Sequence, residues 1–232
     1  MGVREIAAGA PLVRAFTARL STTRTGAAWA RSPASPRSTS PPPHVILHEL
    51  GHHAFRVPTP IHLCDTPDAT LGEAAPHWLA LRDDREARRR ERRELVEPGC
   101  FGLRSAPLAY ETHAFGGGLL LDMLAARIGR EALESHLVRG AGWADLAARL
   151  DPLDAAWLDA WLSAPAWPRP ELVDGLLVDR AETGLSGEVT LRWDTGELQT
   201  VALGSAVQPP PGATTAEIDP ELRFLSAPDR SP

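Results

Sequence analysis

The chain has 232 residues, a formal net charge of −6 and 43% hydrophobic residues. This length accommodates one catalytic domain with a hydrophobic core, together with tails. The acidic balance argues against a nucleic-acid-binding protein, which would present a basic surface. No stretch approaches the about 18 apolar residues needed to cross a bilayer, and the first 20 residues lack the apolar segment of a signal peptide. With two cysteines and no Cys-x-x-Cys spacing, we expect free thiols and a cytoplasmic protein.

The N-terminal segment, residues 1–43, offers little that a fold can bury. Residues 21–43 are rich in Ser, Thr, Arg and Pro. Such a composition cannot offset the entropy cost of ordering the chain. We therefore predict that this segment is largely a disordered linker.

The stretch from His48 to His52 reads His-Glu-x-x-His and follows the apolar run Val45–Leu47. We predict a helix here that ends near Phe55. Residues four apart lie on the same face of a helix, so both histidines can present a ring nitrogen to one zinc ion. Glu49 follows the first histidine directly and can accept a proton from metal-bound water. The alternative is a surface cluster of histidines without a metal, because the motif also occurs by chance.

A second helix is predicted to begin near Glu73 and to run through Leu81. Pro76 lies within this stretch, and proline is tolerated in the first turn of a helix, where its missing N–H costs nothing. Between the two helices, the loop at 56–70 contains His62, which we interpret as solvated, with a metal ligand as the alternative. Residues 82–97 contain seven arginines and six acidic residues, a mixture typical of a solvated helix face held by i,i+4 ion pairs.

Apolar periodicity predicts helices at 115–128, 131–139, 143–150 and 153–162. After a proline-rich break, strands are predicted at 176–178, 188–193 and 198–203, with a turn at 194–197 between the last two. The sequence therefore predicts a mainly α protein with a small β meander, of the α+β class. Its segments are a helical domain at 44–165, a meander packed on that core at 166–204 and a loose C-terminal tail at 205–232.

Residues 44–162 resemble the gluzincin zinc metallopeptidases, the group that includes thermolysin and the peptidase-MA-like and neutral aminopeptidase families. In these families a second helix carries a zinc-binding glutamate. Glu73 matches that position, with 20 residues between it and His52. Small residues follow Glu73, and Trp78 lies five positions after it, as in the aminopeptidase branch. The resemblance implies a Zn²⁺ ion held by His48, His52 and Glu73.

The chain also departs from this family pattern. The aminopeptidase branch places a tyrosine at the start of the core helix to stabilise the oxyanion, whereas this chain has Phe115 there. Tyr110 and His113 are the candidates for the missing donor. The family also carries a β-sheet ahead of the motif, which residues 1–43 cannot supply. The resemblance thus implies a zincin-like helical core whose N-terminal sheet is reduced or missing, or else a chain whose N-terminus is truncated or misread.

Motif and resemblance together predict a zinc-dependent peptidase, in which a metal-bound water attacks the peptide bond and Glu49 is the general base. Its partner would be a peptide or protein substrate, and we expect it to bind neither nucleic acid nor a membrane. The sequence does not indicate the oligomeric state. One alternative is a degenerate, catalytically inactive zincin-like scaffold or binding protein. The other gives the arginine-rich residues 82–97 the function of binding an acidic partner.

Overall fold

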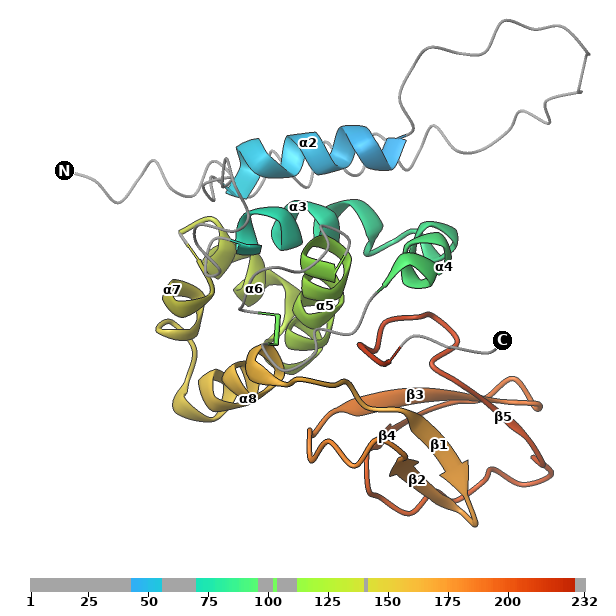
Figure 1. The fold of residues 1–232 in the computed structure, drawn as a ribbon. Coiled ribbons are helices and arrows are strands. Elements are labelled where there is room, and N and C mark those ends of the chain that lie inside the picture. Colours follow the sequence, from blue (N-terminus) through green and yellow to red (C-terminus); the bar gives the residue numbers. More distant parts are fainter. Residues whose placement is uncertain (1–42, 56–69, 96–101, 104–111, 140–141, 228–232) are drawn as a thin grey trace, which may run out of the picture.

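The computed structural model describes residues 43–55, 70–95, 102–103, 112–139 and 142–227 (Figure 1). The helices are α2 (Pro43–Phe55), α3 (Leu71–Leu81), α4 (Arg85–Glu94), the π-helix η4 (Thr112–Gly116), α5 (Gly117–Ile128), α6 (Arg130–Leu137), α7 (Trp143–Ala147) and α8 (Pro152–Ser163). The strands are β1 (Pro170–Val173), β2 (Leu176–Asp179), β3 (Glu188–Trp193), β4 (Leu198–Ala202) and β5 (Ala216–Ile218). The predicted α+β class is confirmed.

Helix α3 is central to the helical part of the molecule and lies between α2 and α5 (Figure 1). All of its residues except His77 are buried. On one side, a Cβ added at Gly51 of α2 would lie 2.6 Å from the Cα atom of Pro76. On the other side, a Cβ at Gly117 of α5 would lie 2.7 Å from the Cβ atom of Ala74. Glycines on both neighbouring helices therefore let α2 and α5 approach α3 closely.

Pro76 occupies a different place in its helix from the one predicted. The helix begins at Leu71, so Pro76 lies inside it and beyond the first turn. A proline in a helix interior removes one backbone hydrogen bond and costs about 3 kcal/mol. The predicted helix start near Glu73 was wrong because it considered only the local cost of proline, whereas Pro76 also makes a tertiary contact. Its backbone and ring pack against Gly51, where no side chain intervenes.

The four helices predicted between residues 115 and 162 are confirmed as α5 to α8, with small shifts of their ends. Gly129 ends α5, as expected, with a φ of +91° that favours glycine. Trp157 and Trp161 of α8 are buried and donate hydrogen bonds to the carbonyl of Ser186, at 2.9 and 3.0 Å. These two indole groups attach the segment before β3 to the helical part.

The three predicted strands are confirmed as β2, β3 and β4, but they do not form one meander. Strands β3 and β4 pair antiparallel around the predicted turn, with Arg192 opposite Leu198. Strand β2 instead pairs with β1 in a separate two-stranded sheet, and β5 pairs with the other side of β3. Alternate residues of β3, among them Val189 and Leu191, are buried. This alternation is why β3 was readable from the sequence.

The predicted loose tail is wrong for residues 216–227. This segment forms β5 and then buries Phe224 and Leu225. The Phe224 ring packs edge-on against Trp161, with ring centroids 5.7 Å apart, and the amide of Leu225 lies 3.3 Å from the sulfur of Met123. The surrounding Pro- and Ala-rich composition gave no periodic signal for these few apolar side chains.

In the described part of the chain, no helix has the length and apolar character that a bilayer crossing requires. The predicted N-terminal linker and the expected reduction of an N-terminal sheet concern residues 1–42, which lie outside the described residues. Both therefore stay predictions.

Candidate metal centre

Helix α2 presents His48 and His52 one turn apart on the side that packs against α3. The same side carries Phe55, whose buried ring lies 6.4 Å from that of Trp78, measured between centroids. Val45 and Ile46 lie on the outer side and are 38% and 39% exposed. The apolar run before the motif is therefore not fully buried in the described structure. His48 and His52 face inward together because residues four apart lie on the same side of a helix.

Glu73 lies in the first turn of α3 and is buried. A carboxylate at a helix N-terminus is stabilised by the partial positive charge of the unpaired amides. The start of this helix is held by Thr70, whose buried hydroxyl accepts a hydrogen bond of 2.8 Å from the Trp143 indole of α7. The core thus fixes the position from which Glu73 extends.

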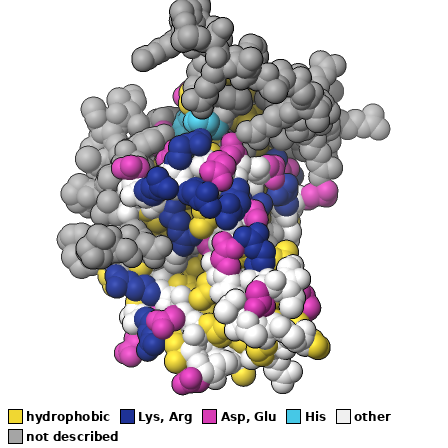
Figure 2. All heavy atoms as spheres, turned by 90° about the vertical axis from the view of Figure 1, so that its right-hand side faces the viewer, with side chains coloured by type: hydrophobic (Ala, Val, Ile, Leu, Met, Phe, Trp, Pro, Cys, Tyr) yellow, Lys and Arg dark blue, Asp and Glu magenta, His cyan; other side chains and the backbone are white. Residues whose placement is uncertain are grey.

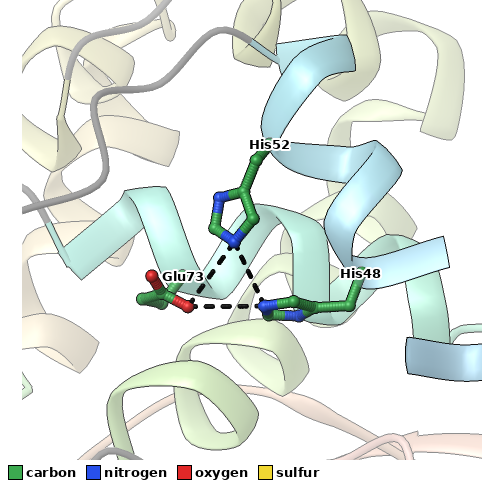
Figure 3. A group of neighbouring side chains, drawn as sticks. All are labelled: His48, His52 and Glu73. Atoms are coloured by element: carbon green, nitrogen blue, oxygen red, sulfur yellow. Dashed lines mark hydrogen bonds and ion pairs between the residues drawn. The ribbon is translucent and has the colours of Figure 1, made fainter. Parts of the chain in front are cut away.

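The three side chains point toward one another from the two helices (Figure 3). The Nε2 atoms of His48 and His52 are 3.2 Å apart. The Oε2 atom of Glu73 lies 3.5 Å from Nε2 of His48 and 3.8 Å from Nε2 of His52. Two ligand atoms at about 2.0–2.1 Å from a tetrahedral zinc ion are themselves about 3.3–3.4 Å apart. The observed triangle therefore approximates one face of a zinc tetrahedron.

The protonation of the cluster also suits metal binding. Burial lowers the pKa of His52, the Glu73 carboxylate raises it, and His48 lowers it again; the overall direction is downward. A lowered pKa favours the neutral imidazole near pH 7, which is the form that binds metals. A divalent cation between these side chains would be partly balanced by the negative charge of Glu73.

Glu49, the predicted general base, is exposed on α2. Burial is the main influence on the pKa of His52, but the Glu49 carboxylate also acts on it and raises it less than Glu73 does. Glu49 therefore lies within electrostatic reach of the cluster. Its role in proton transfer stays a prediction.

Of the two predicted oxyanion donors, the structure describes His113 alone. Tyr110 lies outside the described residues, as does His62. His113 is buried in η4, where burial lowers its pKa and the backbone of Leu103 opposes this only in part. Among the described residues, His48, His52 and Glu73 form the group close enough to share a metal ion. The roles of Tyr110 and His113 stay predictions.

His77 is a neighbour of the cluster that the sequence reasoning missed. Its ring lies edge-on against that of His48, with centroids 5.3 Å apart and an angle of 82° between the planes. Its Nε2 atom is 3.7 Å from Oε2 of Glu91 on α4, and His77 lowers the pKa of that carboxyl against the effect of burial. His77 follows Glu73 by four residues. This i,i+4 spacing is the signal that could have identified it.

The arginine-rich stretch forms a different kind of cluster. The helical conformation is interrupted between α3 and α4. Asp84 caps the start of α4, where its side chain accepts a hydrogen bond from the amide of Ala87. Arg88 is 3% exposed and donates to the carbonyls of Leu81 and Arg82, at 2.6 and 2.8 Å. These bonds join α4 to the end of α3. The prediction of a solvated face is wrong for Arg88.

Other arginines of this stretch bind distant parts of the chain. Arg92 donates to Asp219 at 2.8 Å and to Ser226, while Arg82 donates to Glu134 of α6 at 2.7 Å. Figure 2 shows arginine and acidic side chains intermixed across this part of the surface. The predicted i,i+4 pairing is therefore wrong for these arginines, because guanidinium groups reach acceptors far along the sequence. Because these arginines already bind acidic groups of the same chain, they do not favour the alternative in which residues 82–97 bind an acidic partner.

A cavity of about 380 Å³ lies away from the cluster, lined by α5, α8, the strands and the C-terminal segment. Met123, Trp157 and Phe224 form part of its lining, and none of the three cluster residues does. We therefore do not assign the cluster's chemistry to this cavity.

No family model, curated protein or solved structure matches this chain. A functional conclusion therefore rests on the cluster itself and on the chemistry of its residues.

Proposed function

We propose that this protein is a zinc-dependent peptidase of the gluzincin type, with His48, His52 and Glu73 as the zinc ligands. The observation that carries the proposal is the triangle of donor atoms, with sides of 3.2, 3.5 and 3.8 Å. Two imidazole nitrogens and one carboxylate oxygen are a ligand set of catalytic zinc sites, which keep one position for water or substrate. The peptide substrate is proposed from the sequence resemblance of residues 44–162.

Bound zinc would acidify a water molecule and polarise the substrate carbonyl. Glu49 would accept a proton from that water and then deliver it to the leaving nitrogen as the peptide C–N bond breaks. Its exposed position directly after His48 leaves the carboxylate accessible to solvent. Tyr110 or His113 would donate a hydrogen bond to the oxyanion, an interaction of roughly 3–4 kcal/mol in enzymes where a single donor has been removed.

One observation favours the inactive scaffold as a second candidate. Phe115 occupies the position at which the aminopeptidase branch has its tyrosine, and it is buried in η4. Its ring packs against His77, with centroids 6.3 Å apart, and carries no hydroxyl group. A protein that binds zinc without turning over a peptide would be consistent with this substitution.

Metal analysis and a cleavage assay separate the two candidates. We expect the purified protein to bind one zinc ion and to cleave members of a peptide mixture. Glu49→Gln should keep the zinc and lose cleavage, whereas Glu94→Gln, at an exposed position of α4, should keep both. Equal cleavage by the wild type and Glu49→Gln would refute the mechanism. Bound zinc without any cleavage would favour the scaffold.

A further inference from the structure

His77 is a partly buried imidazole whose ring nitrogens lack hydrogen bonds in the described part of the structure. Both of its ring nitrogens are inaccessible to solvent, and neither has a hydrogen-bond partner there. Buried polar atoms without partners are uncommon and indicate a missing ion, a missing water or a functional role. On one side His77 faces the ring of His48, and on the other it faces the Glu91 carboxylate at 3.7 Å.

The separation of the two rings is compatible with a hydrogen bond between them. Two imidazoles joined by an N–H···N bond of about 2.9–3.0 Å have centroids roughly 5.2 Å apart, because each nitrogen lies about 1.1–1.2 Å from its ring centre. The centroids of His48 and His77 are 5.3 Å apart. The two rings are therefore close enough for a nitrogen of one to bond a nitrogen of the other when the two nitrogens face each other.

Metal binding supplies the reason for such a bond. The Nε2 atom of His48 faces His52 and Glu73, so a metal-bound His48 carries its proton on Nδ1. Metal-binding histidines donate this second N–H to an acceptor that fixes the orientation of the ring. From these contacts we infer that His77 is a positioning residue of the metal centre, accepting from His48 through one nitrogen and donating to Glu91 through the other.

This inference rests on the metal site of the proposed function. It adds Glu91 of α4 to the residues that position the metal ligands. Helix α3 would supply both a direct ligand, Glu73, and its outer partner, His77, one turn further on. Glu91 would hold His77 from α4. Helix α4 is in turn fixed by Arg88 and Arg92, which bind the end of α3 and the C-terminal segment.

The test compares zinc affinities of the full-length chain, measured by competition with a chromophoric chelator. His77→Phe keeps a ring of similar size and removes both nitrogens. We expect it to bind zinc 10–100-fold more weakly, the usual cost of losing an outer-shell partner, and to shift the absorption spectrum of the Co²⁺-loaded protein. Thermal unfolding of the metal-free protein should not change. His77→Gln, which can accept and donate, should recover part of the affinity.

The matched control is His53→Phe, at an exposed position of α2, which should leave affinity and spectrum unchanged. Wild-type affinity in His77→Phe would overturn the inference and leave the metal centre intact. A wild type that binds no zinc would overturn both. If His77→Phe does not fold, Glu91→Gln replaces it, and an unchanged affinity and Co²⁺ spectrum in that variant would overturn the inference.

Discussion

The His48–His52–Glu73 cluster of α2 and α3 and the arginine cluster of α4 are both polar and at least partly buried, but they differ in how their groups meet. In the arginine cluster, donors face acceptors: Arg88 binds backbone carbonyls and Arg92 binds the Asp219 carboxylate. In the metal cluster, two imidazole nitrogens and a carboxylate oxygen face one another within 3.2–3.8 Å. Only a proton or a cation stabilises that arrangement. Complementary pairing thus indicates a structural role, whereas the converging nitrogen and oxygen atoms are the arrangement that the proposed metal site would use.

The largest expected effect is the loss of zinc binding on removal of a direct ligand. His48→Ala should weaken binding by more than the 10–100-fold typical of an outer-shell partner. A zinc concentration of about 1,000 times the wild-type Kd should stabilise the wild type by about 4 kcal/mol and the variant by less than about 1.5 kcal/mol, which thermal unfolding with and without zinc would measure. His53→Ala is the control. Equal zinc-dependent stabilisation of His48→Ala and wild type would remove the basis of the comparison.

Next in size is the removal of a buried guanidinium. Arg88→Ala removes the buried guanidinium that donates to the carbonyls of Leu81 and Arg82, so we expect the free energy of unfolding to fall by about 2–4 kcal/mol. Arg89→Ala, at an exposed position of the same helix, should change it by less than about 0.5 kcal/mol. Urea unfolding of the metal-free protein measures both. If the two variants were equally stable, the arginine cluster would not be structural.

A smaller effect is expected where α2 crosses α3. Gly51→Ala places a Cβ 2.6 Å from the Cα atom of Pro76, so the helices must move apart. Overpacking of this kind costs about 1–3 kcal/mol, and we expect zinc affinity to fall as well, because His48 and His52 would move away from Glu73. Urea unfolding and zinc titration of this variant would be compared with His53→Ala. Unchanged zinc affinity would show that the close crossing does not position the ligands.

The smallest effect is the dependence of zinc affinity on pH. Histidine ligands bind as neutral imidazoles, so protons compete with zinc and affinity falls as the pH decreases through their pKa values. Burial lowers the pKa of His52 below its ordinary value of 6.5. Protons therefore compete with zinc for this side chain at lower pH than they would for an ordinary histidine. We expect nearly constant affinity above pH 7 and a decline of up to about 10-fold per pH unit for each protonated histidine below it. Zinc titrations between pH 5 and 8 would test this; affinity that is flat down to pH 5 would exclude histidine ligands.

The sequence by itself determined the features that depend on local geometry. His48 and His52 share a helix face because residues four apart always do, and β3 was readable because its side chains alternate between core and solvent. The glycine at 129 ends α5 for an equally local reason, since its positive φ favours a residue without a Cβ.

The tertiary structure decided everything that depends on contacts between distant segments. The position of Glu73 beside the histidines follows from the crossing of α2 and α3 at Gly51 and Pro76, and no local pattern encodes that distance. The same holds for His77 beside His48, and for the arginines of α4, whose long side chains bind residues more than 100 positions away. Local periodicity fixes which side of a helix a residue occupies; only packing fixes what lies opposite it.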